Sequence, residues 1–479
     1  MNFEQVIGLE VHCELQTNSK MFSAAPVTFG EEPNTKVNEV DMGMTGTMPV
    51  LNKRGVEFAI RVCHALHMEI DELLCFDRKN YYYSDLPKGF QITQDKRPIG
   101  RNGYLDIEVD GVVTRVEIER LHMEEDTAKQ FHFDDYSLID YNRAGIPLIE
   151  IVTRPNIRNG AQAAAYLEKL RQVFLYTDVS DAKMEEGGSM RCDVNISLRP
   201  YGSEKFGIRT EIKNLNSISN VQKAIEFEAL RQEKVLIQGG EVLQETRRFD
   251  EDSRETVMMR AKGGDAVDYK YYTEPNILPI RLDHQWVMQI KDNLPMMADE
   301  REKVYINQYG LPKTDAHILV SNKAISDFYE AAIQTCQEYK LVCNWLLGEV
   351  QAYLNKENLA ISETKLTPQY LGKMITFIQD GTISSKQAKK VFECLMAEGK
   401  DPEIIIEEKG MKQISDPEQL KIIINEILDN NAQSIQDFAA GKDRAVGFLV
   451  GQIMKNTGGQ ANPKIANQIL IQLLKERTK

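Results

Sequence analysis

The strongest constraint on the fold is a change of sequence pattern near Asn293. Before that residue, apolar and polar side chains alternate with period two between turn residues, which is typical of strands in an antiparallel sheet. After it, apolar residues recur at helical spacing and strand signals nearly vanish. The sequence therefore predicts an α+β protein, in which a domain with a largely antiparallel sheet precedes an all-helical region.

The length of 479 residues fits two or three domains, at about 150 residues for each domain. A second break falls between Gly399 and Pro402, before another set of helical patterns. We therefore predict three domains, which span residues 1–293, 294–405 and 406–479.

Individual elements can be predicted where the pattern is strong. Tyr104 to Val109 and Val112 to Leu121 flank an Asp-Gly pair, which is a strong hairpin signal. Helical spacing before Asn293 predicts helices at 161–173 and 221–238. After Asn293 it predicts helices at 299–309, 322–338, 341–355, 367–379, 385–397, 443–455 and 463–477.

Charge and apolar content limit the environment and the partners. The net charge of -14 argues against general coating of nucleic acid, because such binding depends on neutralising phosphates. From Phe438 to the end, however, seven basic side chains face two acidic ones, a local charge of +5. This segment is either a solvated tail or an RNA contact. No stretch approaches the roughly 20 apolar residues that span a bilayer, so we expect a cytoplasmic protein with no membrane contact.

Three predicted strands carry ligand-type residues on one face. Strand 6–15 places Glu10 and His12 opposite an apolar face of Ile7, Leu9, Val11, Cys13 and Leu15. Strand 190–199 places Arg191 and Asp193 opposite Met190, Cys192, Val194, Ile196 and Leu198. Strand 208–214 places Glu211 and Lys213 opposite Ile208, Thr210 and Ile212.

Carboxylates, an imidazole and cations together are what a Mg-nucleotide site requires, because Mg²⁺ prefers oxygen ligands and phosphates pair with Lys or Arg. Glu124 and Glu125 could join this set, or could form an exposed acidic turn. The loop 77–91 carries Lys79 and Lys88 beside three consecutive tyrosines and could contact phosphate, or could be an ordinary surface loop. A solvated sheet face is the alternative for all three strands. No GxxxxGK[ST], GxGxxG or GxSxG motif is present.

Several long motifs resemble the GatB family, in the same order along the chain. They are VIGLEVHCELQT, FDRKNYYYSDLPKGFQITQ, RLHMEEDTAK, NRAGIPLIEIVT, RCDVNISLRP, EIKNLNS, ETRRFDE, VGFLVGQIMK and GQANP. The resemblance implies a catalytic domain of the glutamine synthetase and guanido kinase fold type, then a helical domain and a YqeY-like tail that contacts tRNA.

The resemblance also implies an activity, a carbon–nitrogen ligase with glutamine as the amide donor. GatB proteins act with a GatA-type amidase and a GatC-type protein. The side-chain carboxylate of Glu-tRNA(Gln) or Asp-tRNA(Asn) is phosphorylated by ATP with Mg²⁺, and ammonia from the amidase then displaces the phosphate. The sequence does not decide between the two tRNA substrates.

By similarity, the residues above receive roles in this reaction. Glu10, His12 and Glu125 are the expected metal ligands and catalytic residues, with Glu124, Asp193 and Glu211 as further ligands or their supports. Lys79, Lys88, Arg191 and Lys213 are expected to contact phosphate or carboxylate groups, and Lys88 is also assigned to catalysis.

Three departures from the family pattern leave room for a divergent paralogue. Thr45 and Ser84 replace expected prolines, and Gly187-Gly188 contains one extra residue. Two further alternatives are a stand-alone ligase for a small free carboxylate, which the helical tail opposes, and a non-catalytic tRNA-binding scaffold.

Overall fold

The computed structural model describes residues 2–185, 187–261, 269–414, 416–440, 442, 444–458 and 460–478. The chain packs into two compact units, Met1–Ala298 and Asp299–Lys479. The first unit contains the strands, and the elements named in the second are helices. This confirms the predicted α+β class. The further division near residue 405 stays a prediction.

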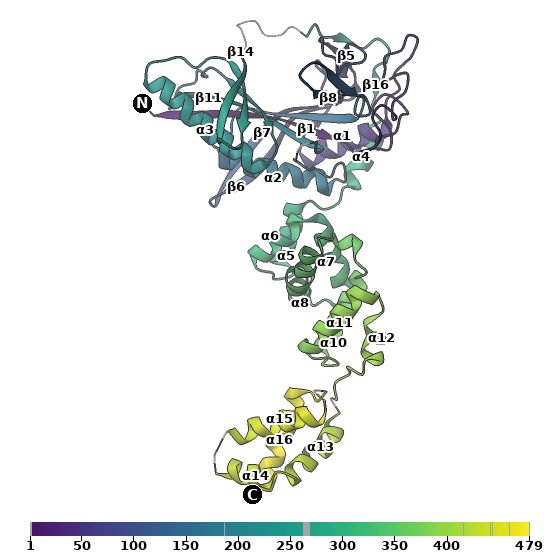
Figure 1. The fold of residues 1–479 in the computed structure, drawn as a ribbon, viewed down its shortest axis with the longest axis vertical. Coiled ribbons are helices and arrows are strands. Elements are labelled where there is room, and N and C mark those ends of the chain that lie inside the picture. The colour runs from purple at the N-terminus through teal and green to yellow at the C-terminus, as the bar shows by residue number, and fades with distance from the viewer. Residues whose placement is uncertain are drawn as a thin grey trace. The chain divides into compact units, whose positions relative to one another are not determined.

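A nine-stranded sheet forms the frame of the first unit (Figure 1). Its spatial order is β14 (Glu255–Ala261), β13 (Glu245–Asp250), β12 (Thr210–Leu215), β11 (Met190–Pro200), β1 (Phe3–Glu14), β10 (Pro147–Thr153), β7 (Val112–Glu125), β6 (Gly100–Val109) and β2 (Glu69–Ile70). Neighbouring strands are antiparallel, except that β12 and β13 are parallel. The predicted hairpin is the β6–β7 pair, and its Asp110 and Gly111 adopt φ of 51° and 78°. These positive values suit the tight turn that Asp-Gly favours.

The apolar face of the sheet packs against helices. Helices α1 (Lys53–Ala65), α2 (Gly160–Tyr176) and α3 (Ile218–Ile237) contribute to one core with β1 and β11. The predicted core residues of both strands are buried, and Ile7, Leu9, Val11, Val194 and Ile196 are all 0% exposed. The prediction for the third strand is wrong at Ile208, which is 49% exposed because β12 begins only at Thr210.

Small sheets and one further helix complete the first unit. They are β15 (Tyr272–Thr273) with β4 (Asp77–Asn80) and β5 (Phe90–Thr93), β16 (Ile280–Arg281) with β3 (Leu73–Leu74), β8 (Lys129–His132) with β9 (Ser137–Asp140), and α4 (His284–Asp292). Strand β5 lies against the end of β7, where the backbone N–H of Ile92 donates to the Glu125 carboxylate. The loop 77–91 is thereby held beside the large sheet.

The second unit is helical, as predicted. Its helices are α5 (Ala298–Asn307), α6 (Lys313–Ser321), α7 (Lys323–Cys336), α8 (Tyr339–Trp345), the π turn η1 (Leu346–Val350), α9 (Gln351–Glu357), the 3₁₀ turn η2 (Ile361–Glu363), α10 (Pro368–Gln379), α11 (Ser385–Glu398), α12 (Pro402–Glu408), α13 (Pro417–Asp429), α14 (Ala432–Ala439), α15 (Arg444–Asn456) and α16 (Pro463–Arg477). Residues of α13, α15 and α16 share a core of their own, which includes Leu420, Leu449 and Leu470. Among the described residues, no helix has the length and apolar content that a bilayer crossing requires.

Candidate functional site

The register of the central strands brings ligand-type side chains into one row. Glu10 on β1 is opposite Asp193 on β11, and His12 is opposite Glu150 on β10. Glu150 is in turn opposite His122 on β7. Because directly opposite residues in antiparallel strands project from the same face, these side chains share one face of the sheet. It is the face opposite the apolar core of β1 and β11.

The first group in this row consists of His12, Glu124 and Glu150, which each place one ligand atom within 4.8 Å of the others. The His12 Nε2 lies 3.2 Å from Glu150 Oε2, and the buried His122 brings its Nε2 to 3.3 Å from the same oxygen. Burial alone would lower the pKa of His122, but the charges of Glu150 and Glu124 outweigh it and raise the pKa to about 9. The carboxylates of this group are therefore partly balanced by imidazole, and a cation could replace the imidazole protons.

The second group consists of Glu10, Asp193 and Glu211, again with ligand atoms within 4.8 Å of one another. Asn195 donates to Glu10 Oε1 at 2.9 Å, and the Lys213 ammonium lies 2.5 Å from Asp193 Oδ2 and 3.2 Å from Glu211 Oε1. Burial raises the pKa of Glu10, and the nearby Glu150 and Asp193 carboxylates raise it further. Three carboxylates face the one ammonium of Lys213, and the remaining negative charge favours a bound cation.

The chemistry of both groups fits Mg²⁺. Five of the six donors are carboxylates and one is an imidazole, which suits a hard divalent ion better than a thiolate-preferring metal. The sequence placed Glu10, His12, Glu124, Asp193 and Glu211 among the candidate ligands, and the structure distributes these five between the two groups.

Glu125, the remaining candidate ligand, lies outside both groups. Its Oε2 is 2.5 Å from the Lys88 ammonium, and its Oε1 accepts from the Ile92 backbone. Glu124, Glu125 and Asp126 are 3%, 4% and 5% exposed, so they are not an exposed acidic turn. The role of Glu125 as a metal ligand stays a prediction, and its partners give it less support than the other five have.

The four candidate cations occupy different surroundings. Lys88 is paired with Glu125, and Lys213 with the second carboxylate group. Arg191 contacts Asp126 at 2.5 Å and Glu14 at 3.5 Å. Lys79 instead lies over the rings of Tyr81 and Tyr269, with its Nζ 5.6 Å and 4.9 Å from their centroids. No ion pair of Lys79 occurs among the residues that the structure describes, so it is the cation best able to accept an incoming anion.

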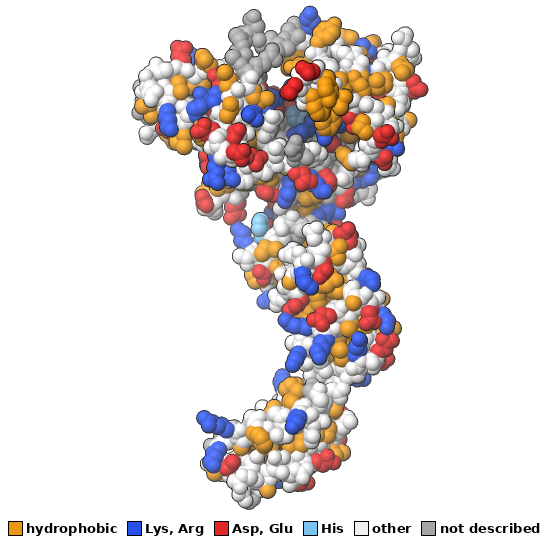
Figure 2. Space-filling view, in the orientation of Figure 1, with side chains coloured by type: hydrophobic (Ala, Val, Ile, Leu, Met, Phe, Trp, Pro, Cys, Tyr) orange, Lys and Arg blue, Asp and Glu red, His pale blue; other side chains and the backbone are white. Residues whose placement is uncertain are grey.

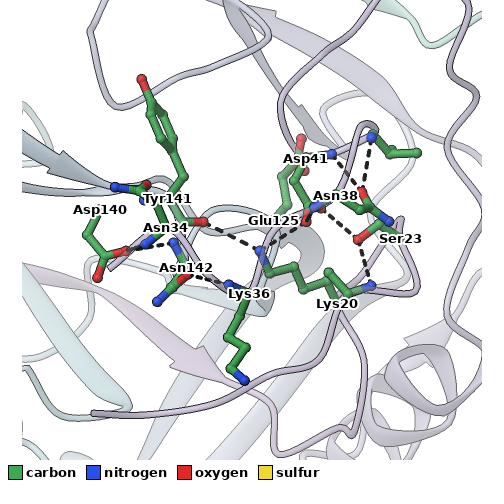
Figure 3. Close-up of polar contacts among 12 residues, drawn as sticks. Lys20, Ser23, Asn34, Lys36, Asn38, Asp41, Glu125, Asp140, Tyr141 and Asn142 are labelled. Carbon is green, nitrogen blue, oxygen red and sulfur yellow. Dashed lines mark hydrogen bonds and ion pairs between the residues drawn. The ribbon is translucent and has the colours of Figure 1, made fainter. Parts of the chain in front are cut away.

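The loop 23–50 borders a cavity of about 180 Å³ that is lined by Gly43, Met44, Arg78, Lys88 and Glu274, among others. The loop is held by a buried network (Figure 3). The fully buried Lys20 donates to Asp41 at 3.0 Å, and Asp41 also accepts from Ser23 and from the backbone of Asn38. Earlier in the loop, outside this buried network, the exposed Asn34 is bonded to Asp140 and Tyr141. The network fixes one wall of the cavity.

Sequence reasoning missed Glu150 and His122 as members of the site. Glu150 lies inside the apolar run PLIEIVT of β10, and His122 lies just before Glu124 on β7. A charged residue in the middle of an apolar central strand is costly unless it is paired or binds an ion. That cost was the available signal for Glu150.

None of the three departures from the family pattern supplies a ligand atom to either carboxylate group. Thr45 is in an exposed turn, and the backbone oxygen of Ser84 accepts from Tyr141. Gly187 and Gly188 form the turn that precedes β11. A Cβ on Gly188 would lie 2.3 Å from the Lys183 carbonyl oxygen, so this turn requires glycine. The turn leads directly into β11, the strand that carries Arg191 and Asp193.

Of the basic residues of the C-terminal segment, five lie on α15 and α16, Lys442 lies between α14 and α15, and Lys479 lies outside the described residues. Figure 2 shows Lys and Arg side chains on the visible face of this segment, interspersed with acidic and apolar ones. Arg477 is paired with Asp429, and Lys442 with Asp437. The segment therefore offers positive charge that is partly neutralised within the protein.

Comparison with known proteins finds relatives for both parts of the chain. Residues 5–288 match the GatB/GatE catalytic domain, and residues 327–474 match the GatB domain. The chain is 55% identical over 477 residues to the B subunit of aspartyl/glutamyl-tRNA(Asn/Gln) amidotransferase from Macrococcus caseolyticus and from Staphylococcus saprophyticus. It is 54% identical over 478 residues to the Oceanobacillus iheyensis protein of the same description. All three matches cover 100% of both chains. The protein therefore belongs to the GatB family of aspartyl/glutamyl-tRNA(Asn/Gln) amidotransferase proteins, which are ligase-type amidotransferases.

Proposed function

We propose that this chain uses ATP to activate the side-chain carboxylate of Glu-tRNA(Gln), Asp-tRNA(Asn) or both, for amidation by ammonia. The descriptions of its relatives include both tRNAs. The observation that carries the proposal is the convergence of two carboxylate groups, with Lys79 nearby, on one face of the central sheet. This arrangement supports phosphoryl transfer better than it supports a passive scaffold.

The proposed reaction has two steps. An oxygen of the substrate carboxylate attacks the γ-phosphorus of ATP, the bond to the bridging oxygen of ADP breaks, and an acyl phosphate forms. Ammonia then attacks the acyl carbon, phosphate leaves, and one proton is lost to give the amide. Activation is needed because an oxide is a poor leaving group, whereas phosphate is a good one.

In this proposal, His12, Glu124 and Glu150 hold one Mg²⁺, and Glu10, Asp193 and Glu211 hold or orient a second cation. Bound Mg²⁺ would neutralise charge on the transferring phosphoryl group. Burial lowers the pKa of Lys79, but nearby negative charge, that of Glu124 foremost, outweighs it and raises the pKa, so the ammonium stays protonated. The Tyr81 and Tyr269 rings hold this ammonium where it can contact phosphate oxygens.

The same proposal assigns partners and parts of the chain. Ammonia would come from a GatA-type amidase, with a GatC-type protein completing the complex in the cytoplasm. Residues 406–479 would contact the tRNA through their basic side chains. The largely antiparallel sheet with helices on its apolar face supports a glutamine synthetase and guanido kinase fold type for residues 1–293.

The test uses the chain reconstituted with GatA-type and GatC-type proteins. We expect Glu150→Gln to lower both amidation of Glu-tRNA(Gln) and tRNA-dependent ADP release by at least about 100-fold, while glutamine hydrolysis continues. Glu117→Gln is the matched control, because Glu117 lies on β7 with its side chain 56% exposed. If Glu150→Gln amidates as well as this control does, the carboxylate face is structural and the proposal is wrong.

A further inference from the structure

We propose that Thr246 is a positioning residue that orients the Glu211 carboxylate in the second group; this rests on the function proposed above. Thr246 lies on β13, directly opposite Glu211 on the parallel strand β12. Its side-chain Oγ1 donates to Glu211 Oε2 at 3.0 Å, and Thr246 is only 7% exposed.

The bond leaves Glu211 with two fixed oxygens. Oε1 faces the Lys213 ammonium at 3.2 Å, while Oε2 accepts from Thr246. A carboxylate held at both oxygens cannot rotate freely about its terminal torsion. Its plane is therefore set toward Glu10 and Asp193 before a cation arrives, and hydrogen bonds of this kind tune a metal site through the ligand that they hold.

Strand β13 pairs with β12 in regular register at this point. The register shift between β13 and β14 places the extra residue on β14, because Thr246 is opposite Arg260 and Arg247 is opposite Met258. Because side chains alternate along a strand, Thr246 faces the site while its neighbours Glu245 and Arg247 pair with each other on the other side, at 2.5 Å.

A second, buried network anchors the same hairpin without touching the carboxylate groups. Glu228 on α3 is 0% exposed and accepts from Arg231, Gln232 and Thr256. Thr256 on β14 donates to it at 2.7 Å and is 3% exposed. Thr246 and Thr256 are thus two buried threonines of one hairpin, one bonded to a proposed ligand and the other to a structural carboxylate.

This pair gives a matched experiment on the full chain in its complex. Two quantities are measured for each variant. Mn²⁺ binding is followed by the electron paramagnetic resonance signal of free Mn²⁺, and stability is followed by the thermal midpoint. We expect Thr246→Val to weaken one class of Mn²⁺ site about 10-fold, and Thr246→Ser to restore it. Thr256→Val should lower the thermal midpoint and leave the Mn²⁺ affinity within about twofold of wild type, because its bond to Glu228 does not hold a proposed metal ligand.

Two outcomes would overturn the inference. Thr246 has no positioning role if Thr246→Val binds Mn²⁺ as tightly as wild type does. The same conclusion follows if Thr246→Val and Thr256→Val weaken Mn²⁺ binding equally. Glu211→Gln separates this failure from failure of the proposed function. If Glu211→Gln weakens Mn²⁺ binding and Thr246→Val does not, only the role of Thr246 is wrong. If Glu211→Gln binds Mn²⁺ normally, the second carboxylate group is not a cation site.

Discussion

The buried ion pair between Lys20 and Asp41 gives the sharpest test of how the cavity wall is held. Lys20 is 0% exposed and Asp41 is 4% exposed. Replacing Asp41 by Asn keeps the shape but leaves the ammonium without its counter-charge, with the Tyr141 carbonyl oxygen at 3.4 Å as a second acceptor. Removing one partner of a buried pair costs about 3–5 kcal/mol.

The destabilisation by Asp41→Asn cannot exceed the free energy of deprotonating Lys20, because the neutral amine no longer needs a counter-charge. Neutralising a lysine with an ordinary pKa of about 10.4 at pH 7 costs about 4.6 kcal/mol, at about 1.36 kcal/mol for each pH unit. The folded Asp41→Asn variant would then bind fewer protons than its unfolded chain, so its stability should rise with pH. By pH 9 the limit falls to about 2 kcal/mol.

The assay needs a signal from the first unit alone. The chain has two tryptophans, Trp286 in the first unit and Trp345 in the second. In a Trp345→Phe background, urea unfolding followed by fluorescence therefore reports on the unit that contains the ion pair. Glu31→Gln is the control on the same loop, because its pair with Lys36 is 3.9 Å long and half-exposed, and it should cost less than about 0.5 kcal/mol.

The ion pair does not hold the loop in this way if the stability of Asp41→Asn stays within about 1 kcal/mol of its background at pH 7, or if the loss of stability does not shrink toward pH 9. The double variant Lys20→Met with Asp41→Asn should be more stable than Asp41→Asn alone, because no charge is then left buried without a partner.

Further predictions concern pH, a turn and the tail. The pKa of His122 rises from 6.5 to about 9 on folding. In the metal-free protein, protonation of His122 therefore stabilises the fold fully below pH 6.5, and this contribution of at most about 3 kcal/mol is lost as the pH rises through 9. Urea unfolding in chelator should show this loss in wild type and a smaller one in His122→Gln, and equal slopes would contradict the assignment. Gly188→Ala should lower the stability by about 1–3 kcal/mol, because its Cβ would lie 2.3 Å from the Lys183 carbonyl oxygen; Gly348→Ala, with no heavy atom within 4 Å, should change the thermal midpoint little. Deleting residues 406–479 should weaken tRNA binding in filter assays and reduce its salt dependence, and an unchanged salt slope would exclude the tail as a phosphate contact.

The sequence predicted those parts of the fold in which a local pattern decides the outcome. Period-two alternation identified β1 and β11 and the correct core face of each, because burial on one side imposes that alternation. Short helices such as α6 and α12 escaped prediction, since seven to nine residues carry too little periodic signal. Ile208 was misassigned for a related reason: alternation does not mark where a strand begins.

The site was predictable only as a set of residues. Glu124 and Glu125 are adjacent on β7, so alternation separates their side chains, but it does not indicate that Glu124 joins His12 and Glu150 while Glu125 pairs with Lys88. That division depends on how β5 packs on β7, through bonds from Thr93 to Glu124 and from Ile92 to Glu125. Long-range contacts of this kind have no counterpart in the spacing of residues along the chain.

The charge balance of the face explains why the fold tolerates so many carboxylates. In the first group, His12 and His122 lie beside Glu150, and in the second, Lys213 lies beside Asp193 and Glu211. Because a buried carboxylate without a counter-charge is costly, these bases stabilise the face when no metal is bound. A cation that enters must compete with these bases, because the imidazole protons and the Lys213 ammonium already neutralise part of the carboxylate charge. The proposed site is therefore suited to a cation that arrives with ATP and adds the charge of the phosphates, rather than to one held permanently by the protein alone.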